Sequence, residues 1–400
     1  MSLMPVDDAL LALLDDILPR ECEWVPLEEA NGRKLAQDLV SKLTQPPFAA
    51  SAMDGYAVRH EDAAKPDVRL TVIGEAPAGH AFQGAVGTGE AVRIFTGAPV
   101  PEGADTILIQ ENAERTENQV RVVEAPTKGR FVRAAGLDFS LGDTLIKVGK
   151  TLNYRDLALA AAMNHAVLPV VRKPVVAVLA TGDELVRPGG EPGPDQIIAS
   201  NHAGIAGLVE DCGGIPLDLG ISPDYPKAMA NYVARAIDSK VDVLITLGGA
   251  SVGDHDLVQD VLGEQGMDLA FWRIAMRPGK PLMAGRLGDI KVLGLPGNPV
   301  SSLVCGLLFL KPLLAAMLGE SRLSEETTAV LGADLGENDR RQDYIRAKLE
   351  TDNNGQLVAT PFKRQDSSML ALLAHSGALI IRPPHAPAVK AGDQVKILKL

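Results

Sequence analysis

The chain has 400 residues, of which 46% are hydrophobic and 22% charged, and its formal net charge is −12. This length exceeds what one hydrophobic core usually serves, so we expect two to four domains. The acidic balance and the 4% aromatic content argue against a general nucleic-acid-binding surface, which needs a basic face and stacking rings.

The N-terminal part predicts helices first and short strands after them. Apolar residues recur at helical spacing from Val6 to Ile17, Pro19 ends this run, and a second short helix is expected over 27–36. After Pro46-Pro47 the pattern changes to short β runs punctuated by glycine and proline, at 70–73, 91–95, 106–109 and 119–123. A helix over 156–166 follows.

From Pro174 onward strands and helices alternate. Buried strands are expected over 175–179, 241–247 and 290–295, with helices over 201–211 and 225–237 and a long one from Val300. This alternation predicts a doubly wound α/β domain. The apolar stretch from Val300 to Leu318 contains Lys311 and Pro312, so we interpret it as a buried helix and not a membrane span. Beyond Arg322 short strands return and predict a small C-terminal β domain.

Three predicted strands end in loops rich in glycine and polar residues, namely 181–185, 248–256 and 296–302. Ligands bind outside the carboxyl ends of the strands in open α/β sheets, and glycines let backbone amides approach an anion. The segment 271–291 adds five basic residues against one acidic residue. These features favour a local anion-binding site, although each loop taken alone could be a tight turn.

Carboxylates gather in the same loops. Asp183, Glu184, Asp254 and Asp256 could hold Mg²⁺ beside a phosphate or could cap the helices that follow. His202 and His255 are interpreted as incidental. The chain has no nucleophile-elbow pattern and no P-loop pattern, so neither a hydrolase nor a P-loop NTPase is indicated. The widely separated Cys22, Cys212 and Cys305 predict no disulfide framework or zinc site and fit a reducing cytoplasm.

Six motifs, in order and spacing, resemble the molybdopterin molybdenumtransferases, the MoeA and gephyrin E-domain family. They are PPFAASAMDGYA at 46–57, RIFTGAPVP at 93–101, TGDEL at 181–185, GGASVGDHD at 248–256, RPGKP at 277–281 and PGNPVS at 296–301. The resemblance implies insertion of molybdate into adenylylated molybdopterin, with release of AMP and molybdenum cofactor, using Mg²⁺ or Zn²⁺ in the cytoplasm.

The resemblance also implies an α/β multidomain architecture and an elongated homodimer. An elongated linking domain would comprise 1–44 and 139–173, with a β-rich domain inserted at 45–138. A MogA-like α/β domain that binds molybdopterin would cover 174–320, and a C-terminal β-barrel-like domain 321–400. Further expected partners are small-molecule substrates and, transiently, the adenylyltransferase and molybdoenzyme apo-proteins or chaperones, without nucleic acid or membrane.

Site residues are carried over one at a time, from the motifs and from further positions that match the family. The catalytic set that the resemblance implies is Asp54, Glu184, Asp256, Lys280 and Arg277, with Glu184 and Asp256 as the metal ligands. The substrate-binding set is Thr181, Gly182, Asp183, Asn201, Gly248, Gly249, Ser251, Gly253, Arg273, Pro281, Pro296, Gly297, Asn298, Pro299, Ser301, Arg346 and Ser367. Asp138 and Asp224 match further acidic positions.

The sequence departs from the family pattern in two places. Arg273 and Arg277 stand where many members carry lysine, and the planar, bidentate guanidinium changes the geometry of anion contact. Ala371 and Gly377 stand where a serine and an asparagine are expected. Two other functions remain open, an adenylyltransferase-type activity and a non-catalytic pterin-binding scaffold. The domains that carry Asp54 and Arg346 favour the transferase, because the adenylyltransferase consists of the α/β domain alone.

Overall fold

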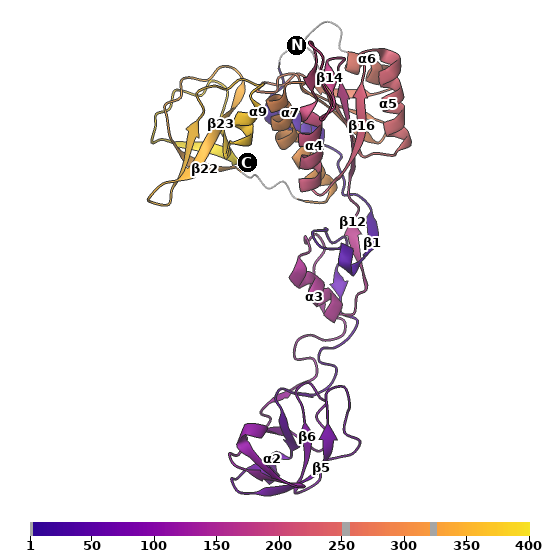
Figure 1. The fold of residues 1–400 in the computed structure, drawn as a ribbon, viewed down its shortest axis with the longest axis vertical. Coiled ribbons are helices and arrows are strands. Elements are labelled where there is room, and N and C mark those ends of the chain that lie inside the picture. Colours follow the sequence, from indigo (N-terminus) through magenta and orange to yellow (C-terminus); the bar gives the residue numbers. More distant parts are fainter. Residues whose placement is uncertain (1–2, 250–256, 321–325) are drawn as a thin grey trace. The chain divides into compact units, whose positions relative to one another are not determined.

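The computed structural model describes residues 3–249, 257–320 and 326–400. Internal contacts divide the chain into two compact units (Figure 1). One unit comprises Met1–Glu23 with Val171–Leu400, and the other is Trp24–Val170. Each unit has its own hydrophobic clusters and is described separately.

A six-stranded mixed sheet is the centre of the first unit. Its order is β16 (Ile215–Ser222), β13 (Val175–Thr181), β17 (Val243–Leu247), β21 (Ile290–Leu295), β20 (Met283–Leu287) and β18 (Asp268–Trp272). The first four strands are parallel, and β20 and β18 are antiparallel. The connecting helices are α4 (Ser200–Asp211), α5 (Pro226–Asp238) and α6 (Leu257–Glu264). The predicted doubly wound domain is confirmed, with a short pair β14 (Leu185–Val186) and β15 (Ile197–Ile198) beside it.

Both faces of this sheet are buried, as the continuous apolar strands predict. Val176 and Val178 of β13 face one hydrophobic cluster, to which α4 contributes Ile205 and Val209. Ala177 faces the opposite cluster, which includes residues of α5 and α6. Side chains therefore alternate between two cores along a single strand, and the strand ends are held rigidly.

The N-terminal helix belongs to this core and not to a linking domain. α1 (Val6–Leu14) forms as its helical spacing predicts, and it buries Val6, Leu10 and Leu13 in the cluster that contains β13. Residues 1–23 therefore depart from the predicted 1–44 segment, because the apolar face of α1 finds its partner in the α/β domain. The remaining predicted domain boundaries stay a prediction.

The long apolar helix from Pro299 to Met317 is a core element. It consists of α7 (Pro299–Cys305), a π-helical turn (Gly306–Leu310) and α8 (Lys311–Met317). By length and composition it is the one helix of the described residues that could cross a membrane, yet 61% of its most apolar window is buried inside the protein. The interpretation as a buried helix is confirmed.

A five-stranded barrel forms the C-terminal part of the first unit. Its ring runs β23 (Gln342–Thr351), β24 (Leu357–Pro361), β22 (Glu326–Leu331), β26 (Gln394–Lys399) and β25 (Ala378–Arg382), and it closes through β25 on β23. A short strand that precedes β20 in sequence, β19 (Met276–Arg277), pairs with β23 in parallel. The helix α9 (Leu370–Ala374) lies close to α7. This pairing fixes the 277–281 segment against the barrel.

The second unit contains a six-stranded sheet and several smaller elements. The sheet order is β7 (Thr106–Ile109), β4 (Gly55–Val58), β6 (Glu90–Ile94), β5 (Arg69–Ala76), β9 (Gln119–Val122) and β8 (Ala113–Thr116). Smaller pairs join β1 (Cys22–Pro26) to β12 (Val167–Val171), β2 (Leu39–Val40) to β11 (Thr144–Ile146) and β3 (Ala50–Ser51) to β10 (Val132–Arg133). The helices are α2 (His60–Ala63) and α3 (Tyr154–Ala162), with 3-10 turns at Leu27–Glu29 and Gln110–Asn112.

One predicted helix of this unit is wrong. The segment expected to be helical over 27–36 forms only the 3-10 turn Leu27–Glu29. Lys34 then bridges Thr151, and the fully buried Leu35 bridges Val170. The apolar spacing that resembled a helix serves instead to bury Leu35 in an extended segment.

Candidate active site

The three predicted loops meet at one edge of the α/β sheet. Ala180 of β13 pairs with Leu247 of β17, which pairs in turn with Leu295 of β21, so the carboxyl ends of the three strands are level. The amide of Gly248 donates to the carbonyl of Leu295 at 3.1 Å. Polar loops that are far apart in sequence thus surround one space, as the strand-end rule requires.

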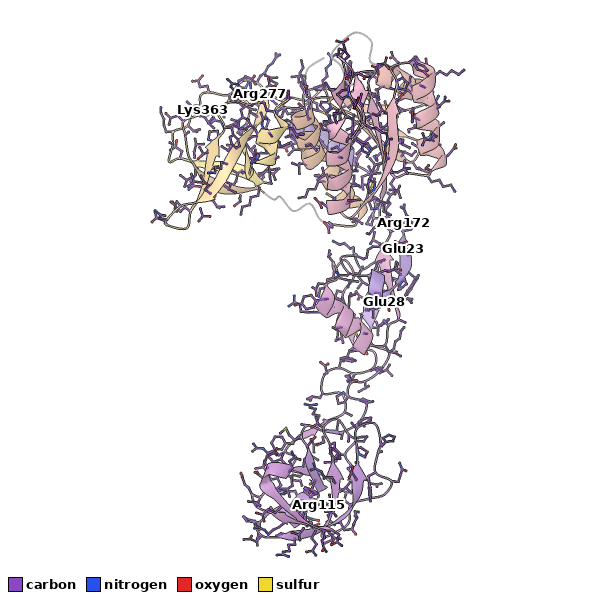
Figure 2. The ribbon with its side chains drawn as sticks, in the orientation of Figure 1. Glu23, Glu28, Arg115, Arg172, Arg277 and Lys363 are labelled. Atoms are coloured by element: carbon purple, nitrogen blue, oxygen red, sulfur yellow. The ribbon has the colours of Figure 1, made fainter. Side chains whose placement is uncertain are left out.

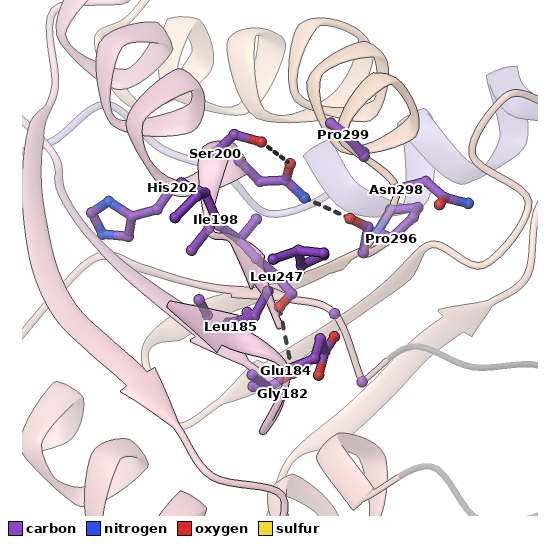
Figure 3. A pocket seen from close by; sticks show the side chains of 18 of the residues that line it. Gly182, Glu184, Leu185, Ile198, Ser200, His202, Leu247, Pro296, Asn298 and Pro299 are labelled. Atoms are coloured by element: carbon purple, nitrogen blue, oxygen red, sulfur yellow. Dashed lines mark hydrogen bonds between the residues drawn. The ribbon is translucent and has the colours of Figure 1, made fainter. Parts of the chain in front are cut away.

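A cavity of about 450 Å³ opens at this edge (Figure 3). Its volume is in the range of small-molecule sites. Eleven residues of the predicted site line it, namely Thr181, Gly182, Glu184, Asn201, Gly248, Gly249, Pro281, Pro296, Gly297, Asn298 and Pro299. The cavity thereby gathers most of the predicted substrate-binding set whose positions are described.

Two hydrogen bonds fix the walls of the cavity, and both are drawn in Figure 3. The side-chain amide of Asn201, in the first turn of α4, donates to the carbonyl of Gly297 at 2.7 Å. The hydroxyl of Thr181 donates to the carbonyl of Leu247 at 3.4 Å. The first bond ties α4 to the loop before α7, and the second ties β13 to β17, so the cavity is held in shape without a ligand.

Gly249 is required by its backbone and its surroundings. Its φ of +67° lies in the left-handed region, and a Cβ there would come within 2.2 Å of Cγ2 of Val258. A larger residue would therefore displace the start of α6 or the loop itself. The prediction that these glycines allow close backbone approach is consistent with this geometry.

Three carboxylates lie together beside the cavity. Glu184 and Asp224 line it, and the amide of Asp224 donates to Oδ1 of Asp183 at 3.2 Å. Partial burial of Asp224 raises its pKa, and the nearby charges of Asp183 and Glu184 raise it further. This concentration of negative charge is one that a bound cation would relieve.

The rest of the predicted metal site is not described. Ser251, Gly253 and Asp256, together with Asp254 and His255, lie outside the described residues. Within the described ranges, no group of three His, Cys, Asp or Glu side chains is placed to hold a metal ion. The assignment of Glu184 and Asp256 as metal ligands stays a prediction.

Arg277 is not part of the cavity wall, and its catalytic role stays a prediction. The guanidinium of Arg277, which Figure 2 labels, forms an ion pair with Asp343 and lies 3.5 Å from Asp339, both in the barrel part of the unit. The hydrogen bond that Arg277 donates to the Asp343 carboxylate raises the pKa of Arg277. The cause is the β19–β23 pairing, which places Arg277 directly opposite Asp343. Arg277 therefore links the loop to the barrel.

The other cations of this segment also lie outside the cavity wall. Arg273 has a left-handed backbone with φ of +73°, and its guanidinium stacks on the Trp272 ring at 4.0 Å. The carbonyl of Lys280 accepts from the amide of Ile274 at 3.0 Å, and no carboxylate of the described residues pairs with its ammonium group. Lys280 immediately precedes the cavity residue Pro281.

Arg346 is a buried cation of the barrel. It is 1% exposed and forms no ion pair with any carboxylate in the described part of the chain. Burial lowers its pKa. A charge taken from water without a counterion is costly, so an unpaired buried guanidinium favours the binding of an anion.

The start of α7 lies next to the loop that contacts Arg346. The amide of Val300 donates to the carbonyl of Ser367 at 3.1 Å, and the Arg346 guanidinium donates through Nη1 to the carbonyl of Met369 at 3.4 Å. Ser301 is buried in the first turn of the same helix. The structure therefore brings Ser301, Ser367 and Arg346 into one neighbourhood, although none of them is part of the cavity wall.

Asp54 belongs to the second unit, where it joins two of the motifs. Its Oδ1 accepts from both the amide and the hydroxyl of Thr96, each at 2.8 Å. These bonds, and the charge of Arg93, lower the pKa of Asp54. The carboxylate is only half-buried, so it is ionised and accessible at neutral pH.

Sequence reasoning missed part of the cavity wall. Ile197, Ile198, Ser200 and His202 also line it, and His202 lies 3.0 Å from Asp218. Ile197 and Ile198 form β15, whose pairing with β14 shapes one side of the cavity. A two-residue strand has no periodicity to recognise, so no signal in the sequence marked these residues.

Three protein-family models match consecutive parts of the chain. A MoeA N-terminal region (domain I and II) matches residues 4–164, a probable molybdopterin-binding domain matches 177–316, and a MoeA C-terminal region (domain IV) matches 328–400. Together they account for nearly all of the sequence.

Curated proteins and solved structures are similar over the full length. The chain is 35% identical over 390 residues to a molybdopterin molybdenumtransferase of a Nostoc species, covering 95% of this chain and 89% of the relative. It is 34% identical to a protein of the same name from Haemophilus influenzae, covering 99% and 98%. A crystal structure of a molybdopterin biosynthesis MoeA protein from Pyrococcus horikoshii superposes with a TM-score of 0.86 at 31% identity, covering 100% and 99%.

Proposed function

This chain belongs to the MoeA family of molybdopterin molybdenumtransferases, and on that premise we propose that the cavity at the sheet edge is where it inserts molybdenum into molybdopterin. The protein is a transferase of molybdenum cofactor biosynthesis. The observation that carries the proposed site is the cavity itself, whose wall contains ten residues of the motifs and the predicted Asn201.

The adenylyltransferase alternative is not favoured. Its fold corresponds to the α/β domain alone, whereas the relatives named molybdenumtransferase match 95% and 99% of this chain. The barrel with Arg346 and the β-rich sheet with Asp54 have no part in a function confined to the α/β domain. No feature of the described residues supports a purely non-catalytic scaffold.

The described residues suggest a division of the site into two parts. Backbone amides of the glycine loops and the hydroxyl and amide side chains of the cavity would hold the pterin phosphate and adenylate. Arg346, Lys280, Ser301 and Ser367 would bind molybdate beside it, since a buried unpaired guanidinium favours a tetrahedral dianion. Adenylylated molybdopterin and molybdate would then be oriented for transfer. A molybdate oxygen or a water would attack phosphorus, the phosphoanhydride bond would break and AMP would leave, and the dithiolene sulfurs would bind molybdenum.

The carboxylates beside the cavity concentrate charge that would attract Mg²⁺, while within the described ranges no three of them form a ligand set. Burial raises the pKa of Asp224, and the nearby charges of Asp183 and Glu184 raise it further. Oxygen ligands suit Mg²⁺ better than Zn²⁺. Glu184 would hold the ion, with Asp256 as the predicted second ligand. When bound, Mg²⁺ supplies charge neutralisation at the phosphate oxygens.

The reaction can be tested directly. Purified protein, incubated with adenylylated molybdopterin, Mg²⁺ and molybdate, is expected to release AMP and to form molybdenum cofactor, both measured by chromatography. Omission of molybdate is the control. If ATP is consumed instead, or if no AMP appears while a known family member releases it, the proposed reaction is wrong.

We further propose that the protein is a homodimer and that Asp54 acts in the site of the second copy. The second unit exposes apolar side chains close together in sequence, with Leu137 64%, Leu141 66% and Val148 57% exposed. Large exposed apolar side chains of this kind become buried when they lie in a protein interface. The contacts with the adenylyltransferase, apo-enzymes and chaperones stay predictions.

Replacement of one of these side chains tests the dimer. Leu141→Asp places a charge among them and is expected to shift the mass in light scattering from twice the chain mass of 42.2 kDa to a single chain. Leu11→Asp is the matched control, because Leu11 is 62% exposed on α1 in the other unit. A wild-type protein that is monomeric at micromolar concentration, or a dimeric Leu141→Asp variant, would contradict the proposal.

A further inference from the structure

Gln365 holds the buried guanidinium of Arg346 through an unusually complete set of hydrogen bonds. Its Oε1 accepts from the backbone amide of Arg346 at 3.0 Å and from Nε at 3.2 Å. Its Nε2 donates to the carbonyl of Arg346 at 3.0 Å and to that of Phe362 at 2.9 Å. The primary amide thus clamps both the main chain and the side chain of Arg346.

This clamp is neutral, although two carboxylates lie near enough to influence Arg346. Both Asp343 and Asp366 favour its charged form. Asp343 is engaged by Arg277, and Oδ1 of Asp366 accepts from the amide and hydroxyl of Ser368 at 2.8 and 2.6 Å. Neither forms an ion pair with Arg346 in the described residues. The local structure therefore keeps the available counterions occupied.

The guanidinium also retains hydrogen-bonding capacity. Nε is bound to Gln365 and Nη1 to the carbonyl of Met369, while no acceptor in the described ranges takes a hydrogen bond from Nη2. A carboxylate at position 365 could accept the same two bonds as the amide oxygen, but it would neutralise the cation as well. An amide accepts without neutralising.

We propose that Gln365 is a positioning residue that orients Arg346 and preserves its unpaired positive charge, so that the substrate oxyanion is the counterion. This inference rests on the proposed function, in which Arg346 contacts molybdate. Whether residue 365 carries an amide or a carboxylate then sets the affinity of the site for the oxyanion. Gln365 itself is exposed, so its replacement does not disturb a core.

The variants Gln365→Glu and Gln365→Ala separate this role from a structural one. Glu keeps an acceptor for the two bonds from Arg346, adds a charge and loses the two bonds that Nε2 donates, whereas Ala removes all four hydrogen bonds. We expect Gln365→Glu to raise KM for molybdate about tenfold, with kcat within about twofold, because the new carboxylate pairs with Arg346. Gln365→Ala should raise KM less. The control Gln356→Glu adds the same charge in an exposed turn of the barrel and should change neither constant.

Calorimetric titration of the full-length variants with molybdate measures the affinity independently of turnover. If wild-type protein binds molybdate and Gln365→Glu binds it equally well, or if Gln365→Ala is the more impaired variant, the positioning role is wrong and the clamp is only structural. If wild-type protein neither binds molybdate nor releases AMP, the proposed function is wrong, and so is this inference, which rests on it.

Discussion

Asp54→Asn is expected to lower the rate of AMP release by a hundredfold or more, about the loss seen when one preorganised charged or polar group is removed from an active site. The physical reason is charge alone. The Asn carbonyl can still accept from the amide and hydroxyl of Thr96, so the turn that joins the two motifs is preserved. Single-turnover assays with saturating molybdate and Mg²⁺ give the rate, and thermal unfolding gives the stability.

Asp105→Asn is the matched control for this variant. Oδ1 of Asp105 also accepts from a backbone amide and a hydroxyl, those of His60 at 2.7 Å and Thr106 at 3.0 Å, in the same sheet. Asp105 lies in none of the six motifs. Equal losses of activity in the two variants would show that Asp54 is a turn residue, and a lower melting temperature for Asp54→Asn alone would show the same.

The alternation of apolar strands and helices was enough to predict the α/β domain and the edge at which the cavity lies. Val176 and Ala177 face opposite cores. A strand that is buried on both faces has a continuous run of apolar residues, as this one does. The cavity residues Thr181, Gly248 and Pro296 followed because strand ends in a parallel sheet coincide in space. The local pattern therefore predicted the location of the cavity.

Contacts between distant parts of the chain determine the positions of other residues, which the local sequence pattern does not predict. Arg277 sits in a cation-rich segment, and nothing in that segment indicates that β19 joins a barrel strand and pairs Arg277 with Asp343. Likewise, Leu35 has helical spacing but is buried by bridges to residues more than a hundred positions away. The clamp between Gln365 and Arg346 also depends on strand pairing. Arg346 lies on β23 and Gln365 follows β24, so the antiparallel pairing of these strands within the barrel brings the two residues together.

Removing the charge of the buried Asp242 carboxylate is expected to lower the stability of the fold more than removing the charge of other buried ionisable residues. It is 6% exposed and binds two guanidinium groups, with Arg172 at 2.8 Å to each oxygen and Arg20 at 3.1 Å. The amide of Val175 donates to it at 2.7 Å. Asp242→Asn leaves two cations without their shared counterion at the start of β13, and we expect a loss of about 3 kcal/mol in the free energy of unfolding, measured with urea.

The matched control is Asp218→Asn, since Asp218 also binds an arginine and a backbone amide but its side chain is 42% exposed. Its loss should stay within about 1 kcal/mol, as for other exposed ion pairs. Similar losses in both variants would mean that burial does not set the strength of the Asp242 cluster.

The pH dependence of stability gives an independent check on Asp242. Burial alone would raise the pKa of Asp242, but the bonds from Arg172 and Val175 outweigh it and lower the pKa. A lowered pKa in the folded state means that this carboxylate stabilises the fold fully above the unfolded pKa, at about 4, and loses its contribution as the pH falls through the folded value. Wild-type protein should therefore lose more stability than Asp242→Asn on acidification below pH about 4, and the two curves should converge. Parallel curves throughout the acid range would exclude a lowered pKa at Asp242 and, with it, the ionic origin of the stabilisation.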